Sequence, residues 1–232
     1  MLKEKIYFIT AVGTDIGKTF LVENICRNLL NSKLAVEAIK PVQSGFLDGD
    51  VKSDSARILQ ALGKDLSQEN FDIISPWHFE KAISPHFAAR AENQEIIFSE
   101  VANFCHEKIK MAKKDNQFLF IEGAGGLMTP LTDDKSFLDL LVDLKIPVLL
   151  LSANYLGAIS HTLCAVETMK SRGITPEQII INDYLKNSEE NSKENSKENL
   201  LIDISQIIKT IKTFSGVETI SINHFFQTLP RI

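Results

Sequence analysis

The stretch TAVGTDIGKT, residues 10–19, decides the fold. It follows an apolar run at 6–9 and precedes a helical stripe of apolar residues at 22–29. A strand, a tight turn and a helix start, in that order, place several backbone N–H groups and the positive end of the helix dipole around one point. Gly17 lets the backbone approach a ligand closely, Lys18 can bridge β- and γ-phosphate oxygens, and the Thr19 hydroxyl can ligate Mg²⁺. The stretch therefore predicts a loop that binds a polyphosphate.

At one position, residues 10–19 depart from the usual phosphate-loop pattern. The phosphate-loop pattern G-x-x-x-x-G-K-[ST] asks for a glycine five residues before Gly17, where this chain has Val12. The alternative is an ordinary strand-to-helix turn that contains a chance Gly-Lys-Thr. We favour the phosphate loop, because the flanking strand and helix agree with the context that the motif requires.

Short apolar runs alternate with helix-length amphipathic segments along most of the chain. This alternation is typical of successive βαβ units. It predicts an α/β fold with a doubly wound, mostly parallel sheet and helices on both faces, as in P-loop NTPases. One helix is expected at 160–172, ending before Gly173, because glycine tolerates the left-handed conformation beyond a helix end. A weaker strand is expected at 71–75, and six better supported ones at 6–9, 34–39, 118–121, 148–151, 178–181 and 217–222.

Composition bounds the architecture and the partners. With 232 residues, 44% of them apolar, the chain can form one sizeable core, and we expect a single domain over 1–232. Its 30 acidic and 25 basic residues give a net charge of −5. This balance gives no electrostatic reason to expect nucleic acid or an anionic membrane as a partner. A small molecule is therefore the expected ligand.

The sequence also disfavours membrane, secreted and metal-scaffold proteins. Its apolar stretches are far shorter than the ~20 residues that span a bilayer, and its start lacks the pattern of a signal peptide, so we expect a cytoplasmic protein. Cys26, Cys105 and Cys164 form no Cys-x-x-Cys pair, which argues against a disulfide framework or a zinc site, and we expect each to be a small buried group. Residues 186–199 hold no apolar side chain and repeat NSKE, which predicts a solvated, low-complexity loop.

A second acidic signal follows the strand expected at 118–121. Glu122 stands at its end, and the glycine-rich run GAGG comes next, at 123–126. A carboxylate that emerges from a buried strand beside the phosphate loop can hold Mg²⁺, while the glycines permit close backbone approach. The alternative is a carboxylate that caps a turn. We interpret Glu122 as the second half of a site whose first half is formed by Gly17, Lys18 and Thr19.

The chain resembles a known family in a set of spaced motifs. The phosphate loop, KPVQSG at 40–45, the pair Ser53 and Asp54, SPH at 84–86 and EGAGG at 122–126 occur in this order in dethiobiotin synthetases. The resemblance covers roughly residues 5–183. It implies an ATP-dependent ligase that uses Mg²⁺, acts as a homodimer and joins CO₂ to 7,8-diaminononanoate. The product would be dethiobiotin, formed through a carbamate and a carbamic-phosphoric anhydride, with release of ADP and phosphate.

The resemblance also implies roles for particular residues. In the reaction itself, the implied residues are Lys18, Lys40 and Thr14. For Mg²⁺, they are Thr19, Asp54 and Glu122. For the diamine, they are Thr14, Ser44, Gly157 and Ala158, the last two in a loop that reaches across a dimer interface. For ATP, they are Asp15, Ile16, Gly17, Lys18, Thr19, Phe20, Asp54, Glu122, Gly123, Ala124, Gly125, Asn182 and Asp183.

Each of these assignments has a plainer alternative. Lys40 at a strand exit can be a solvated cap, Asp54 can cap a helix, and Asn182 with Asp183 can form a simple turn. The family's last strand usually exits through a proline-containing turn near the adenine, which this chain lacks, so we expect no particular adenine contact near the C-terminus.

Two other functions remain open from the residues alone. The first is a nucleotide-switch ATPase of the ParA and MinD kind, but those proteins carry a signature lysine five positions before the loop lysine, where this chain has Gly13. The second is an inactive relative that binds ATP as a structural module. Fold alone would not separate these options.

Overall fold

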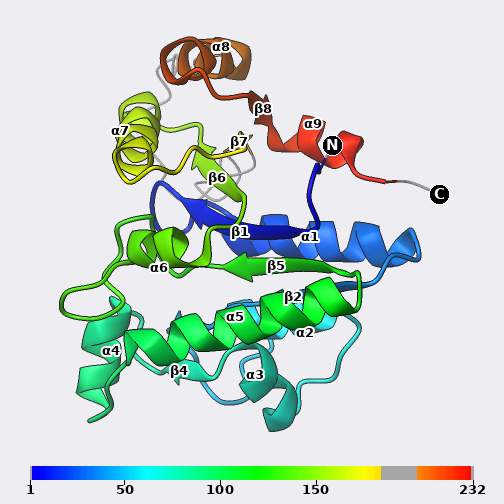
Figure 1. The fold of residues 1–232 in the computed structure, drawn as a ribbon, viewed down its shortest axis with the longest axis vertical. Helices are drawn as coiled ribbons and strands as arrows, with labels where there is room; N and C mark the ends of the chain where they lie inside the picture. The colour runs from blue at the N-terminus through cyan, green and yellow to red at the C-terminus, as the bar shows by residue number, and fades with distance from the viewer. Residues whose placement is uncertain (1, 184–202, 231–232) are drawn as a thin grey trace, which may run out of the picture.

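The computed structural model describes residues 2–183 and 203–230. Its centre is a six-stranded sheet with the strand order β2-β5-β1-β6-β7-β8, in which every pair is parallel (Figure 1). The strands are β1 (Ile6–Ala11), β2 (Val36–Ile39), β5 (Phe118–Glu122), β6 (Val148–Ala153), β7 (Gln178–Asn182) and β8 (Thr219–Ser221). The expected α/β fold is confirmed.

The strand order brings the carboxyl ends of three strands together. The chain runs from β1 outward to β2, returns through β5 between them, and then continues to β6 on the other side of β1. The registers pair Ile9 with Glu122 and Ala11 with Leu151. Ligands of open α/β sheets bind outside the carboxyl ends of the strands where the strand order reverses, so the topology places the candidate site beyond β1, β5 and β2.

Helices cover the sheet on both faces (Figure 1). Helix α1 packs against α2, α5 packs against α6, and α7 packs against α8. They are α1 (Lys18–Asn31), α2 (Asp54–Ala61), α3 (Gln68–Ile74), α4 (Pro85–Ala91), α5 (Phe98–Lys114), α6 (Phe137–Leu144), α7 (Ala158–Ser171), α8 (Ile204–Ser215) and α9 (Ile222–Thr228). Among the helices of the two described ranges, none has the length and apolar character of a bilayer-spanning segment.

Helix α1 shows why the expected elements form. Its residues Leu21, Val22, Ile25, Cys26 and Leu29 are all buried, as their helical spacing predicts. Helix α7 begins two positions before the expected 160 and ends at Ser171, and Gly173 takes a left-handed φ of 74° just beyond it. The helix therefore stops where the glycine predicts.

One predicted strand is wrong and two strands are new. Residues 71–75 belong to α3 and its end, not to a strand, because Ser67 caps a helix start by accepting the N–H of Asn70. The new strands β3 (Val42–Ser44) and β4 (Trp77–Phe79) form a separate parallel pair. Three residues each are too few for an alternating pattern to be visible in the sequence.

Two smaller expectations need comment. Cys26 and Cys105 are buried as expected, but Cys164 is exposed on α7, which corrects the prediction for that residue. The polar loop expected at 186–199 lies outside the described residues.

Candidate active site

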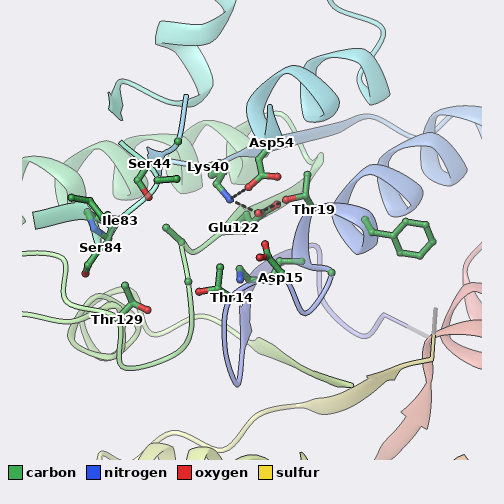
Figure 2. Close-up of a pocket in the computed structure, with 18 of the residues that line it drawn as sticks. Thr14, Asp15, Thr19, Lys40, Ser44, Asp54, Ile83, Ser84, Glu122 and Thr129 are labelled. Carbon is green, nitrogen blue, oxygen red and sulfur yellow. Dashed lines mark hydrogen bonds and ion pairs between the residues drawn. The ribbon is translucent and has the colours of Figure 1, made fainter. Parts of the chain in front are cut away.

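A pocket of about 780 Å³ opens beyond the carboxyl ends of β1, β2, β5 and β7. Figure 2 shows Lys40, Asp54, Thr19 and Glu122 pointing toward one another on one side of it, with Ser44 and Ser84 on another. The lining comprises Thr14, Asp15, Gly17, Lys18, Thr19, Phe20, Lys40, Ser44, Gly45, Asp54, Arg57, Ala82, Ile83, Ser84, Pro85, Glu122, Ala124, Gly125, Thr129, Pro130 and Asn182.

The phosphate loop has a backbone conformation that requires glycine at position 17. Gly17 is the residue before α1 and has a left-handed φ of 101°, and a Cβ there would lie 2.3 Å from Asn182 Nδ2. Helix α1 has no side-chain cap and no acidic residue in its first turn. Its first N–H groups and its dipole are thus available to an anion. Lys18 Nζ lies 3.3 Å from the carbonyl oxygen of Gly13, which holds this ammonium over the loop.

The glycine-rich run after β5 packs directly on this loop. A Cβ at Gly126 would lie 3.1 Å from the Cα of Gly13, so only glycine leaves the two backbones this close. Gly125 has a φ of 63°, and Thr129 accepts the N–H of Gly126 at 2.8 Å. The EGAGG segment therefore packs the end of β5, which carries Glu122, against the phosphate loop.

Beside the loop, two carboxylates share one lysine. Lys40 Nζ lies 2.6 Å from Asp54 Oδ2 and 2.6 Å from Glu122 Oε1, and Thr19 Oγ1 donates to the same Glu122 oxygen at 2.7 Å (Figure 2). Lys40 and Glu122 are buried. Charged groups are tolerated in such a place only when they are paired, so these residues hold one another in position.

The pKa values follow from this pairing. Burial lowers the pKa of Lys40, but the nearby carboxylates of Glu122 and Asp54 outweigh it and raise the pKa above its ordinary value. Burial raises the pKa of Asp54, yet the charge of Lys40 turns the net shift downward. Burial, followed by repulsion from Lys40, lowers the pKa of Lys18 to about 8. Lys18 is thus a cation whose charge the protein compensates poorly, and a bound anion would compensate it.

The oxygen atoms of this cluster fit a magnesium ion. Thr19, Asp54 and Glu122 supply one hydroxyl and two carboxylates, the hard ligands that Mg²⁺ prefers. Glu122 Oε2 is buried and has no hydrogen-bond partner among the described residues. A buried carboxylate oxygen without a partner is costly unless a cation or donor approaches it.

Asp54 is positioned by caps on both sides of it. It is the first residue of α2, after Ser53, whose hydroxyl accepts the N–H of Ala56. Gln43 of β3 adds a second cap, because its Oε1 accepts the N–H of Ser55 at 3.0 Å. The KPVQSG segment therefore places Lys40 beside the carboxylates, and through Gln43 it also caps α2, the helix that carries Asp54.

At the end near β7, the pocket is lined by two neutral side chains, Asn182 and Phe20. Asn182 Nδ2 donates to the carbonyl oxygen of Ile16 at 2.9 Å, so this buried amide ties β7 to the phosphate loop. Phe20 lines the pocket and meets Phe226 of α9 edge-on, with 6.0 Å between ring centroids. Asp183 lies 3.4 Å from Asn223 Nδ2.

The structure brings most of the predicted site residues into one pocket. Five predicted residues are not part of its lining, and these are Ile16, Gly123, Asp183, Gly157 and Ala158. Gly157 precedes α7 with a φ of 96° and is exposed, whereas Ala158 is buried. The motifs missed a further set of lining residues, namely Arg57, Ala82, Ile83, Thr129 and Pro130. Of these, only Arg57 left a usable signal, because it stands one helical turn after Asp54.

Comparisons with known proteins identify relatives of this chain. The AAA domain family matches residues 5–222. The chain is 38% identical to an ATP-dependent dethiobiotin synthetase from Acidiphilium cryptum, over 76% of this chain and 78% of that protein. It is 36% identical to the protein of the same name from Legionella pneumophila, over 77% of this chain and 80% of that one.

Solved structures support the fold alone. A MinC:MinD cell division protein complex from Aquifex aeolicus superposes with a TM-score of 0.52 and 12% identity, over 93% of this chain and 79% of that one. Identity this low says nothing about activity, and it leaves the P-loop α/β architecture as the shared feature.

Proposed function

The chain belongs to the family of ATP-dependent dethiobiotin synthetases, and on that premise we propose that it joins CO₂ to 7,8-diaminononanoate and closes the cyclic urea of dethiobiotin. One amine of the diamine takes up CO₂ and becomes a carbamate. A carbamate oxygen attacks the γ-phosphoryl group of ATP, ADP leaves, and a carbamic-phosphoric anhydride results. The second amine then attacks the carbonyl carbon, phosphate leaves, and the ring closes.

The observation that carries the proposal is the convergence of Lys18 and Lys40 at one pocket. Phosphoryl transfer to a carbamate brings several negative oxygens together, and catalysis then depends on positioning and cationic stabilisation. Lys18 and the uncapped start of α1 would bind the triphosphate. Lys40, held by Asp54 and Glu122 at 2.6 Å each, would lie between the γ-phosphoryl group and the carbamate.

Thr19, Asp54 and Glu122 would hold Mg²⁺, and the bound ion would neutralise phosphate oxygens. Glu122 Oε2, which has no hydrogen-bond partner within residues 2–183 and 203–230, supports this assignment. Thr14 and Ser44 would hydrogen-bond the diamine or its carbamate, since both line the pocket. Asn182 and Phe20 would contact the adenosine part of ATP.

We also propose a cytoplasmic homodimer. Gly157 and Ala158 are not part of this chain's pocket lining, and the neighbouring Leu156 is 99% exposed. The loop before α7 is therefore accessible to a second chain, and the dimer itself is what the resemblance to the family implies. In a dimer, the start of α7 would reach the diamine bound by the partner subunit.

The proposed reaction is tested by supplying the diamine, bicarbonate and MgATP and measuring phosphate release. We expect release that depends on the diamine and yields dethiobiotin in equal amount. Phosphate release without the diamine would instead favour a nucleotide-switch ATPase, and binding of ATP with no release would favour an inactive relative.

A further inference from the structure

An ion pair joins α1 to α2 one helical turn from Thr19 and Asp54. Arg57 Nε lies 3.1 Å from Glu23 Oε2, and Arg57 Nη2 lies 3.0 Å from Glu23 Oε1, so the pair is bidentate. Glu23 follows Thr19 by one turn of α1, and Arg57 follows Asp54 by one turn of α2. The two helices pack on each other, so the pair lies one turn away from two of the proposed magnesium ligands.

Arg57 has a second possible partner. Residues three apart on a helix are neighbours, and an Asp and an Arg at this spacing attract each other. Asp54 and Arg57 have this spacing, both line the pocket, and their side chains are 40% and 34% exposed. In the structure, however, Asp54 is paired with Lys40 and Arg57 is paired with Glu23. A guanidinium released from Glu23 could therefore turn to Asp54.

We propose that Glu23 is a positioning residue that holds the guanidinium of Arg57 away from Asp54, and so keeps the Asp54 carboxylate for Lys40 and for the magnesium of MgATP. The inference rests on the proposed function, because it assigns Asp54 to the metal. A bidentate carboxylate pair is the arrangement that holds a guanidinium most firmly in one orientation. Glu23 is not part of the pocket lining, whereas Arg57 is, so Glu23 would act through Arg57.

A purely structural tie between α1 and α2 makes a different prediction. If the pair only joined the helices, removing either partner would lower the stability of the fold but leave the Mg²⁺ dependence of ATP binding unchanged. If Glu23 restrains Arg57, removing Glu23 alone is harmful, and removing Arg57 as well relieves the harm. Arg27 lies 3.9 Å from Glu23 and can keep the glutamate paired when Arg57 is changed.

The test uses the full chain in four forms: wild type, Glu23→Gln, Arg57→Gln and the double variant. Equilibrium binding of ATP is measured by calorimetry across a range of free Mg²⁺, which requires no turnover, and thermal unfolding shows that each form is folded. We expect Glu23→Gln to raise the Mg²⁺ concentration needed for half-maximal ATP binding about tenfold, the usual effect of losing a group that orients a metal ligand. The double variant should recover to within about threefold of wild type.

A control comes from another ion pair whose cation is similarly exposed, Lys64 at 30% against Arg57 at 34%. Lys64 Nζ bonds both oxygens of Glu37 at 2.8 and 2.9 Å, away from the pocket, and Glu37→Gln should leave the Mg²⁺ dependence unchanged. Equal Mg²⁺ dependence in wild type and Glu23→Gln would overturn the inference, as would a double variant no better than Glu23→Gln. If the chain binds MgATP as expected but shows no diamine-dependent phosphate release, the proposed function fails while the role of Glu23 stands.

Discussion

At the phosphate end of the pocket, charged groups hold one another in place, whereas at the end near β7, neutral groups hold the backbone. Lys40 Nζ lies 2.6 Å from Asp54 and 2.6 Å from Glu122, and of these three residues Lys40 and Glu122 are buried. Asn182 instead binds the carbonyl oxygen of Ile16, and Phe20 packs edge-on against Phe226. A buried charge that loses its partner is far more costly than a lost neutral contact. We therefore expect changes at the phosphate end to be severe and changes near β7 to be graded.

The largest effect is expected for Lys40→Met. This change removes the cation between the proposed carbamate and phosphoryl group, so the diamine-dependent rate should fall about 10³-fold. It also leaves Glu122 buried without its cation, and the free energy of unfolding should fall by about 3 kcal/mol. Phosphate release and chemical denaturation measure the two effects separately.

A second variant separates the catalytic role of Lys40 from its structural one. Lys40→Met combined with Glu122→Gln removes both charges of the buried pair, so much of the lost stability should return. The rate should remain low, because no cation has been restored. Near-normal turnover in either variant would remove Lys40 from the mechanism.

The next effect concerns Lys18 and pH. Its pKa of about 8 lies below the ordinary 10.5, so the free protein loses this ammonium as the pH rises through 8. Bound triphosphate favours the charged form, so binding above pH 8 must take up a proton, and affinity for ATP should fall about tenfold from pH 7 to 9. Calorimetry in buffers of different ionisation enthalpy measures this uptake. A constant affinity from pH 7.5 to 9 would contradict the assignment.

The same shift affects stability in the opposite direction. Between about pH 8 and 10.5 the unfolded chain binds more protons at Lys18 than the folded chain does. The contribution of Lys18 to the free energy of unfolding therefore rises with pH across this window. Without ligand, Lys18→Met should remove this rise.

The sequence predicts the phosphate end better than the end near β7, for a physical reason. Residues 10–19 are contiguous, so strand, turn, glycine and lysine reveal their joint role without tertiary information. Glu122 follows a readable buried strand. By contrast, Asn182 contacts Ile16 across 166 positions of sequence, and nothing local in the sequence indicates that hydrogen bond.

The elements that sequence reasoning missed share one property, which is that tertiary contacts decide them. Strands β3 and β4 have three residues each and form by pairing with each other. The wrong strand at 71–75 contains Phe71, Ile73 and Ile74, whose apolar run is too short to distinguish a strand from a helix. The spacing of Arg57 from Asp54 is visible in the sequence, but the ion pair of Arg57 with Glu23 depends on the packing of α1 on α2, which the sequence does not reveal.

At the end of the pocket near β7, the largest effect is expected for Asn182→Ala. The change leaves the buried carbonyl of Ile16 without this donor, so the phosphate loop should loosen and ATP should bind about tenfold more weakly. Because the loop itself is affected, inhibition by tripolyphosphate should weaken by a similar factor. If ATP bound more weakly while inhibition by tripolyphosphate stayed unchanged, the Asn182 amide would act by contacting the adenine base. Asn24→Ala, which removes a similar bond to the Phe20 carbonyl within α1, serves as the control and should change little.

The smallest effect is expected for Phe226→Leu. Phe226 meets the ring of Phe20 edge-on, and such a pair contributes about 0.5–1.5 kcal/mol beyond its buried area. Leucine keeps the apolar contact but not the ring geometry, so Phe20 should lose part of its fixed orientation in the pocket. The dissociation constant of ATP should rise two- to threefold, about 0.5 kcal/mol.

Tripolyphosphate distinguishes this loss from damage to the phosphate loop, because it lacks the nucleoside that Phe20 would contact. Its inhibition constant should stay unchanged in Phe226→Leu. Phe214→Leu is the matched control, since Phe214 is 72% exposed on α8 and outside the pocket lining. If Phe226→Leu weakened tripolyphosphate as much as ATP, the aromatic pair would support the loop as Asn182 does. Both ends of the pocket would then support the phosphate loop, one through charged groups and the other through neutral ones.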